Sequence, residues 1–320
     1  MKQHYRTVRI AVSAVTLAAV VCLSLANPER SAAAFFIPMV TFLETGRFPV
    51  GSLGTIRPEE TKPPAEEPEK AGITLTAEDL SLIEMLYRCD YRPDTEALLL
   101  QPLDWDLQAA EPTVLIIHTH ATECYTDAPS AQHDPYRTLD NAHNMVAMGQ
   151  QLAALLEAGG IGVIHDTTHH DYPDYNSAYS GARQTVERYL QQYPSIRMVL
   201  DLHRDASDST EGQMVTSATV GGQPSAQLLV MTGSDAGGNY HPNWQKNLSL
   251  ALKLTAVLER EDPGLCRPVT LRSERFNTDL TAGSLIIEVG AAGNTAAEAR
   301  CAIEALARGV IALAQGANNS

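Results

Sequence analysis

Two histidines and a glutamate follow a short apolar run in the first half of the chain. The run is Val114-Leu-Ile-Ile117, and His118-Thr-His-Ala-Thr-Glu123 comes directly after it. His120 and Glu123 are close enough in sequence to turn toward one point, and an imidazole nitrogen and a carboxylate oxygen are ordinary zinc ligands. A hydrolytic zinc site also needs a third protein ligand and an open position for water. The segment therefore predicts half of a zinc site.

A second polar segment, Asp201-Leu-His-Arg-Asp205, ends another apolar run. Its His203 is the candidate third ligand. Asp201 precedes His203 by two residues and can orient that imidazole, as carboxylates next to zinc-bound histidines do. Arg204 can form a structural ion pair with Asp205, bind a polar group of a substrate, or help to hold an oxyanion.

A third segment, Leu285-Ile-Ile-Glu-Val-Gly290, supplies a carboxylate behind an apolar strand. Partial desolvation should raise the pKa of Glu288, which suits a general base. A glutamate at a strand end is also commonly solvated or ion-paired, and Arg272 and Arg275 are the candidate partners in that case. We expect His120, Glu123 and His203 to hold zinc and Glu288 to accept a proton from water.

The two histidines of the first segment are alternatives to one another. On an extended segment the imidazoles of His118 and His120 lie on the same side, so either can be the ligand. We prefer His120, because Glu123 is within its reach, and expect His118 to support the ligands or contact substrate. The cluster His169-His-Asp171 also resembles a metal site, but its Tyr, Pro and Asp neighbours predict a rim loop with a structural or substrate-facing role.

Regular elements alternate along most of the chain. Runs of strand length occur at 114–118, 161–165, 196–202, 227–233 and 284–289, and helical patterns at 80–87, 144–158, 178–193, 242–260 and 295–315. This alternation predicts an α/β fold, with a mostly parallel sheet covered by helices on both faces. In such sheets, sites collect at the carboxyl ends of strands. The three polar segments fall near such ends, so we expect their side chains to be neighbours.

The chain of 320 residues has a formal charge of −15, which argues against binding a nucleic acid. Its N-terminus predicts export, because Lys2, Arg6 and Arg9 precede a charge-free run from Ile10 to Ala26. A cleaved signal and an uncleaved single-pass anchor are both compatible with that run, and we favour the anchor, with the folded part outside the cytoplasmic membrane. Five cysteines lack the spacing of a zinc knuckle or a redox pair, and an exported chain allows four of them to form disulfides.

These features divide the chain into four regions. We expect a basic cytoplasmic flank at 1–9, a transmembrane anchor or signal segment at 10–27, a juxtamembrane segment with a Pro/Glu-rich linker at 28–73, and a catalytic domain at 74–320. The linker is too poor in apolar residues to fold by itself.

The polar segments also bear a family resemblance. The chain resembles the stage II sporulation protein P family, which is related in fold to zinc-dependent N-acetylmuramoyl-L-alanine amidases. The resemblance lies in 114–125, 199–205, 243–248, 284–290 and Gly293-Asn-Thr295, and it covers the chain from about Thr74 to the C-terminus. A membrane segment and a stalk ahead of the domain are also typical of that family.

The resemblance implies hydrolysis of the amide between N-acetylmuramic acid and L-alanine in peptidoglycan during sporulation, with some members also cutting stem peptides. His120, His203 and Glu288 match the two zinc histidines and the base of the related amidases. Their glutamate ligand comes from the start of the next helix, where this chain has Asn141-Ala-His143, so Glu123 is assigned by local spacing alone.

The resemblance further implies two partners, a sporulation lytic transglycosylase and a membrane protein that localises the pair. We also expect Asn277, Asp279, Asn243 and Trp244 to line the cleft. Two other functions remain open at this point: a metallopeptidase with the same ligands, and a non-catalytic scaffold that binds the wall.

Overall fold

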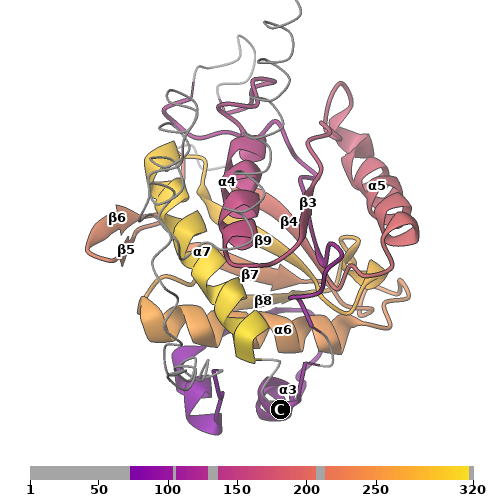
Figure 1. Ribbon diagram of the computed structural model, residues 1–320, viewed down its shortest axis with the longest axis vertical. Helices are drawn as coiled ribbons and strands as arrows, with labels where there is room; N and C mark the ends of the chain where they lie inside the picture. Colours follow the sequence, from indigo (N-terminus) through magenta and orange to yellow (C-terminus); the bar gives the residue numbers. More distant parts are fainter. Residues whose placement is uncertain (1–72, 104–105, 129–135, 207–212, 317–320) are drawn as a thin grey trace, which may run out of the picture. The chain divides into compact units, whose positions relative to one another are not determined.

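A central sheet of seven strands organises the protein in the computed structural model, which describes residues 73–103, 106–128, 136–206 and 213–316. The strand order is β1-β8-β7-β9-β4-β2-β3. The strands are β1 (Met85–Arg88), β2 (Val114–Ile117), β3 (Val163–His165), β4 (Met198–Asp205), β7 (Leu228–Thr232), β8 (Val269–Arg272) and β9 (Ser284–Ala291). A separate hairpin of β5 (Ala218–Val220) and β6 (Gln223–Ser225) projects beside this sheet (Figure 1).

The expected mostly parallel sheet is confirmed, with one antiparallel pairing. Strands β3, β2, β4 and β9 run parallel to one another, and so do β1, β8 and β7, while β7 and β9 are antiparallel. The carboxyl ends of β2, β3, β4 and β9 therefore lie at one edge of the sheet. The polar segments after β2 and in β4 and β9 are brought to that edge.

Helices cover both faces, as expected. They are α3 (Thr95–Leu100), α4 (Met145–Ala158), α5 (Ala178–Gln192), α6 (Trp244–Glu261) and α7 (Ala296–Gly316), with short 3-10 helices η1 (Ala77–Leu82), η2 (Tyr175–Ser177) and η3 (Thr278–Leu280). Figure 1 shows α4 and α7 next to each other on one face, and α5 apart from them.

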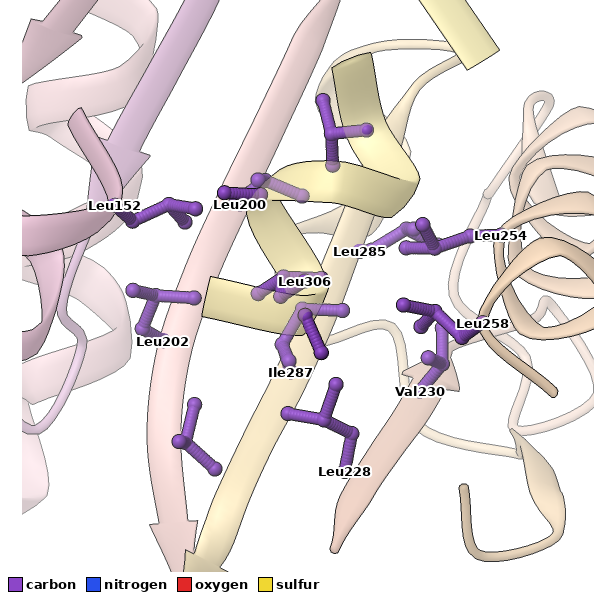
Figure 2. Close-up of a cluster of buried hydrophobic side chains, with 14 of the residues drawn as sticks. Leu152, Leu200, Leu202, Leu228, Val230, Leu254, Leu258, Leu285, Ile287 and Leu306 are labelled. Carbon is purple, nitrogen blue, oxygen red and sulfur yellow. The ribbon is translucent and has the colours of Figure 1, made fainter. Parts of the chain in front are cut away.

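The main core lies between the sheet and helices α4, α6 and α7 (Figure 2). Leu200 and Leu202 of β4 and Leu285 and Ile287 of β9 point into it, toward helix residues such as Leu306. A smaller cluster lies under α5, where Ala182 and Val186 pack on Leu115, Ile117 and Val199. Because side chains alternate along a strand, the odd positions of β4 face α5. His203 therefore lies on the face opposite the main core.

One predicted helix is wrong. The helix expected at 80–87 is the 3-10 helix η1 followed by strand β1. Its start was predicted correctly, because the amide of Thr76 donates to Asp79 Oδ2 at 2.6 Å in a capping box. The same carboxylate also binds Arg260 of α6, and the following residues pair with β8. Pairing across the sheet thus overrides the local helical pattern.

The regions expected at 1–9 and 10–27, and all but the end of 28–73, lie outside the described residues. Within the described part, no helix has the length and apolarity needed to cross a membrane. The expected pairing of four cysteines in disulfides is not found there, since Cys89, Cys124, Cys266 and Cys301 are all free. Cys124 is buried, as predicted for a small hydrophobic side chain.

Candidate metal centre and catalytic site

Adjacent parallel strands bring the predicted residues together. His203 of β4 lies directly opposite Glu288 of β9 in the strand register. Strand β2 lies on the other side of β4, so the loop after β2 carries His120 and Glu123 to the same place. The imidazole centroids of His120 and His203 are 5.3 Å apart, and Glu123 Oε2 lies 3.7 Å from His203 Nδ1. The predicted convergence of three distant segments is therefore found.

His203 lies between carboxylates. Its Nε2 is 3.0 Å from Asp201 Oδ1, although the two atoms are not aligned as a hydrogen bond. Burial alone would lower the pKa of His203, but the charges of Asp201, Glu123 and Glu288 raise it to about 10. An imidazolium thus occupies the centre of an acidic cluster, and Asp201 is placed to orient it as predicted.

His120 has the opposite electrostatic character. Burial, assisted by the charge on His203, lowers the pKa of His120 to about 3, so its imidazole is neutral. Its Nδ1 is buried and has no hydrogen-bond partner among the described residues. A neutral imidazole with an unpartnered buried nitrogen suits a metal ligand. One face of the His120 ring is covered by the ring of Tyr175, which stacks on it at 4.3 Å.

Glu123 is held by Arg204. The amide of Arg204 donates to Glu123 Oε2 at 3.2 Å, and its Nη1 lies 3.5 Å from Oε1. Burial raises the pKa of Glu123, while the charges of Arg204 and His203 oppose that shift. Arg204 also donates to the carbonyls of Cys124 and Tyr136. Its guanidinium therefore fixes the loop that carries Glu123.

Two expectations for Arg204 are consequently wrong. It does not pair with Asp205, which binds Arg267 at 2.7 Å. Its side chain is 5% exposed and already bound to Glu123 and two carbonyls, so it does not face a substrate or an oxyanion. A buried guanidinium has to satisfy its own donors within the protein, and here they reach the neighbouring loop.

Glu288 has an unusual carboxyl group. The residue is partly exposed, but its Oε2 is buried without a partner among the described residues. Burial raises the pKa of Glu288 to about 8, against the lowering effect of His203. The arginines considered as partners bind elsewhere, Arg272 to Glu274 and Arg275 to Asp279. A carboxyl group with a pKa near neutrality suits a general base.

His118 lies away from this cluster. Its Nδ1 is 3.2 Å from the carbonyl of Leu202, and its Nε2 is 2.9 Å from His165 Nε2. Burial lowers the pKa of His118 to about 3, and His165 adds to that effect. Both of its nitrogens are thus engaged within the protein. Of the two histidines of the first segment, His120 is the one that meets His203 and Glu123.

Two aspartates hold the loop after β2, and only one of them was predicted. Asp201 accepts from the amide of Thr119 at 2.8 Å and from its hydroxyl at 2.5 Å. Asp171 accepts in the same way from the amide and the hydroxyl of Thr122. No spacing in the sequence indicates the second contact, because it joins segments 49 residues apart.

The cluster at 169–171 has the structural role expected for it. His170 lies between the carbonyl of His118 and the hydroxyl of Thr185, at 3.0 Å from each. His169 contacts Asn141 Oδ1 at 2.6 Å. These side chains support the loop after β2 from outside the acidic cluster.

The residues expected to line the cleft hold a loop instead. Asn277 donates to the carbonyl of Tyr179 at 2.7 Å, Asn243 donates to the carbonyl of Asp279 at 2.9 Å, Asp279 binds Arg183 at 3.0 Å, and Trp244 stacks on Tyr91 at 5.1 Å. Their polar groups are used to fasten the segment after β8 to α5 and α6. Sequence could not distinguish this role from substrate contact.

The residues of the cluster fit a zinc ion in their chemistry. Within the described ranges, no three His, Cys, Asp or Glu side chains form a finished metal-binding arrangement. Glu123 Oε2 and His203 Nδ1 are 3.7 Å apart, however, which is less than twice the zinc–ligand distance of about 2.0–2.1 Å, so one ion can reach both. The buried His120 Nδ1 is available as a further donor. Three carboxylates beside two imidazoles also favour a divalent cation.

The fold and this cluster define a class: an α/β protein with an acidic, histidine-containing site at the carboxyl edge of a parallel half-sheet. Residues 55–312 match the family model described as Stage II sporulation protein P (SpoIIP). The chain belongs to that family. Stage II sporulation protein P of Bacillus subtilis (strain 168) is 26% identical over 205 residues, which are 61% of this chain and 49% of that protein. The chain thus spans about half the length of this curated relative.

Several solved amidases are similar in structure at a low level. N-acetylmuramoyl-L-alanine amidase AmiC2 of Nostoc punctiforme has a TM-score of 0.39 and 13% identity, over 62% of this chain and 94% of its own. The CwlD amidase from Clostridioides difficile, solved with the GerS lipoprotein, has a TM-score of 0.37 and 14% identity, over 64% and 94%. Similarity this low leaves the function to be argued from the residues.

Proposed function

We propose that the protein is a zinc-dependent hydrolase of peptidoglycan that cleaves the amide between N-acetylmuramic acid and L-alanine during sporulation. The observation that supports this most is the convergence of His120, Glu123, His203 and Glu288, in a chain of the Stage II sporulation protein P family. Endopeptidase activity on stem peptides is a possible extension of the same chemistry, because both reactions hydrolyse an amide.

Each residue has a distinct task in this proposal. His120, His203 and Glu123 would hold the ion, with Asp201 orienting His203 and Arg204 orienting Glu123. A bound zinc ion supplies Lewis-acid polarisation of the amide and lowers the pKa of water. Glu288 Oε2 accepts the proton of the attacking water and returns it to the leaving amine nitrogen.

The electrostatics of the free protein support that division of tasks. A neutral His120 is ready to donate a lone pair, whereas His203 must lose its proton when a cation binds. The positive charge on His203 occupies the acidic cluster when no cation is there. Cation binding and proton release are therefore coupled at this residue.

The location and partners follow as further proposals. We assign the charge-free run from Ile10 to Ala26 to a membrane anchor that holds the domain outside the cytoplasmic membrane, at the forespore septum. A lytic transglycosylase that opens the glycan, and a membrane protein that localises both enzymes, are the expected partners.

Mass spectrometry of digested sacculi tests the proposed bond. Purified sacculi are incubated with the zinc-loaded protein, with the protein after chelation, and with the Glu288→Gln variant. We expect intact stem peptides with free L-alanine amino termini from the zinc-loaded protein alone. Cuts confined to the peptide stems would assign the site to a metallopeptidase, and no zinc-dependent product would leave a wall-binding scaffold.

A further inference from the structure

A row of aromatic rings crosses the candidate site. Tyr175 stacks on one face of His120, with centroids 4.3 Å apart and ring planes at 14°. Tyr179 meets His120 edge-on at 5.6 Å, and Phe276 follows at 5.6 Å from Tyr179. We call Tyr175, His120, Tyr179 and Phe276 the aromatic row. It joins η2, the loop after β2, α5 and the segment after β8.

An arginine covers each end of the aromatic row. The guanidinium of Arg137 lies 4.3 Å from the ring centroid of Tyr175, and that of Arg272 lies 5.4 Å from the centroid of Phe276. Asp171 holds Arg137 at 3.3 Å, and Glu274 holds Arg272 at 3.1 Å. Cation–π contacts of this kind fix the orientation of the outer rings.

The aromatic row is not part of the core. Tyr175, Tyr179 and Phe276 belong to neither apolar cluster of the described residues. Tyr175 is 49% exposed, and the other two rings are half-buried. Large aromatic side chains that stay accessible beside a polar site are typical of ligand-binding surfaces, because ring burial is reserved for a partner.

The segment that carries Phe276 is held in a strained backbone conformation. Phe276 and Asn277 have φ values of 49° and 61°, which non-glycine residues rarely adopt. The side chain of Asn277 ties this turn to the carbonyl of Tyr179 at 2.7 Å, and Arg183 holds Asp279 at 3.0 Å. Strain of this kind persists where surrounding contacts enforce it, commonly at functional sites. Here its effect is to set Phe276 against Tyr179.

We propose that the aromatic row binds the glycan strand of peptidoglycan, with sugar rings stacked on Tyr175 and Phe276 on either side of His120. The apolar C–H faces of pyranose rings pack well on aromatic rings, since both surfaces leave water. Two sugar positions that flank His120 place the substituent between them next to Glu288 and His203. This assignment rests on the proposed function, because it takes peptidoglycan as the substrate.

Binding measurements test the assignment without relying on turnover. The full chain carrying Glu288→Gln is the parent, and Tyr175→Ala, Phe276→Ala and Tyr240→Ala are added singly. Tyr240 is the matched control, because it is 78% exposed and lies outside the aromatic row. Chitohexaose, an uncharged glycan without peptides, is titrated by calorimetry, and purified sacculi are used in sedimentation. Thermal unfolding checks that each variant is folded.

We expect Tyr175→Ala and Phe276→Ala to weaken the binding of both probes by about tenfold, the loss of one buried ring, with Tyr240→Ala equal to the parent. Tyr175→Trp should restore binding, which a purely structural role would not predict. Equal affinity of all variants, or sacculi bound with no binding of chitohexaose, overturns the glycan assignment. Cleavage of sacculi by the parent would instead contradict the proposed role of Glu288, and leaves the affinities to decide about the aromatic row.

Discussion

Asp171 accepts hydrogen bonds from both the amide and the hydroxyl of Thr122. Asp201 binds Thr119 in the same manner. The loop between these threonines carries His120, and Glu123 follows it directly. Two buried carboxylates from different elements thus determine where both candidate ligands lie, and Asp171 in addition holds Arg137 over the ring of Tyr175.

Replacing Asp171 should therefore loosen the zinc site without removing a ligand. We expect Asp171→Asn to raise the zinc dissociation constant by about 10–100-fold, the usual effect of losing a group that orients a ligand. Competition with a fluorescent chelator measures it. Asp174→Asn is the control, because the Asp174 side chain accepts only from the backbone of the exposed helix η2. Equal zinc affinity in the two variants would contradict the role given to Asp171.

The two histidines of the loop should differ in the kind of defect that they produce. His120→Ala removes a proposed ligand, so we expect its zinc dissociation constant to rise by more than about 100-fold. His118→Ala removes the partner of His165 and leaves a buried cavity. It should lower the free energy of unfolding by about 2–4 kcal/mol and affect zinc less. The reverse order of zinc affinities would assign the metal to His118.

Gly149 of α4 should tolerate no side chain. A Cβ atom there would overlap both His118 Nε2 and His165 Nε2. Alanine is worth about 1 kcal/mol over glycine inside a helix, but the overlap should reverse the sign, with Gly149→Ala less stable by about 1–3 kcal/mol. Urea denaturation decides this, with the neighbouring exposed Gln150→Ala as control. A stabilised Gly149→Ala protein would show that the histidine pair is not closely packed.

Lys253 should make stability depend on pH. Burial lowers its pKa from 10.5 to about 8, while its ammonium donates to the carbonyl of Leu99 at the end of α3. Below pH 8 the folded protein therefore bears the full cost of the buried charge. As pH rises from about 8 to 10.5, the unfolded chain holds more protons than the folded one, so this cost is relieved.

We accordingly expect Lys253→Met to unfold at higher urea than the wild type at pH 7, by about 1–2 kcal/mol after loss of the hydrogen bond. The difference should shrink toward pH 10. Lys246→Met, at an exposed position of the same helix, should show neither effect. A difference that is constant between pH 7 and 10 would place the pKa of Lys253 outside this window.

Strong hydrophobic patterns predicted much of the fold. The strands that contain His203 and Glu288 and the helices α4 to α7 were located to within a few residues, because each is long or wholly apolar. Strands β1 and β8 were missed. They are short, and β1 lies at the edge of the sheet, where alternation of exposed and half-buried residues is weak evidence against a helix.

The candidate site was predicted where residues come from strand ends and not where they come from loops. His120, Glu123, His203 and Glu288 follow from the rule that parallel strands end at one edge. The contacts of Asp171, Tyr175 and Arg204 depend on how loops fold over that edge, which no periodicity records. Asn277 was misjudged for the same reason, since its amide is used by the backbone of Tyr179.

The most direct test is a crystal structure of the protein grown with zinc, with anomalous diffraction measured at the zinc edge. We expect one strong anomalous peak bounded by His120, Glu123 and His203, with Glu288 facing the open side of the ion and Asp201 against the far nitrogen of His203. A peak beside His118 and His165, or no peak within the cluster, would contradict the proposed centre.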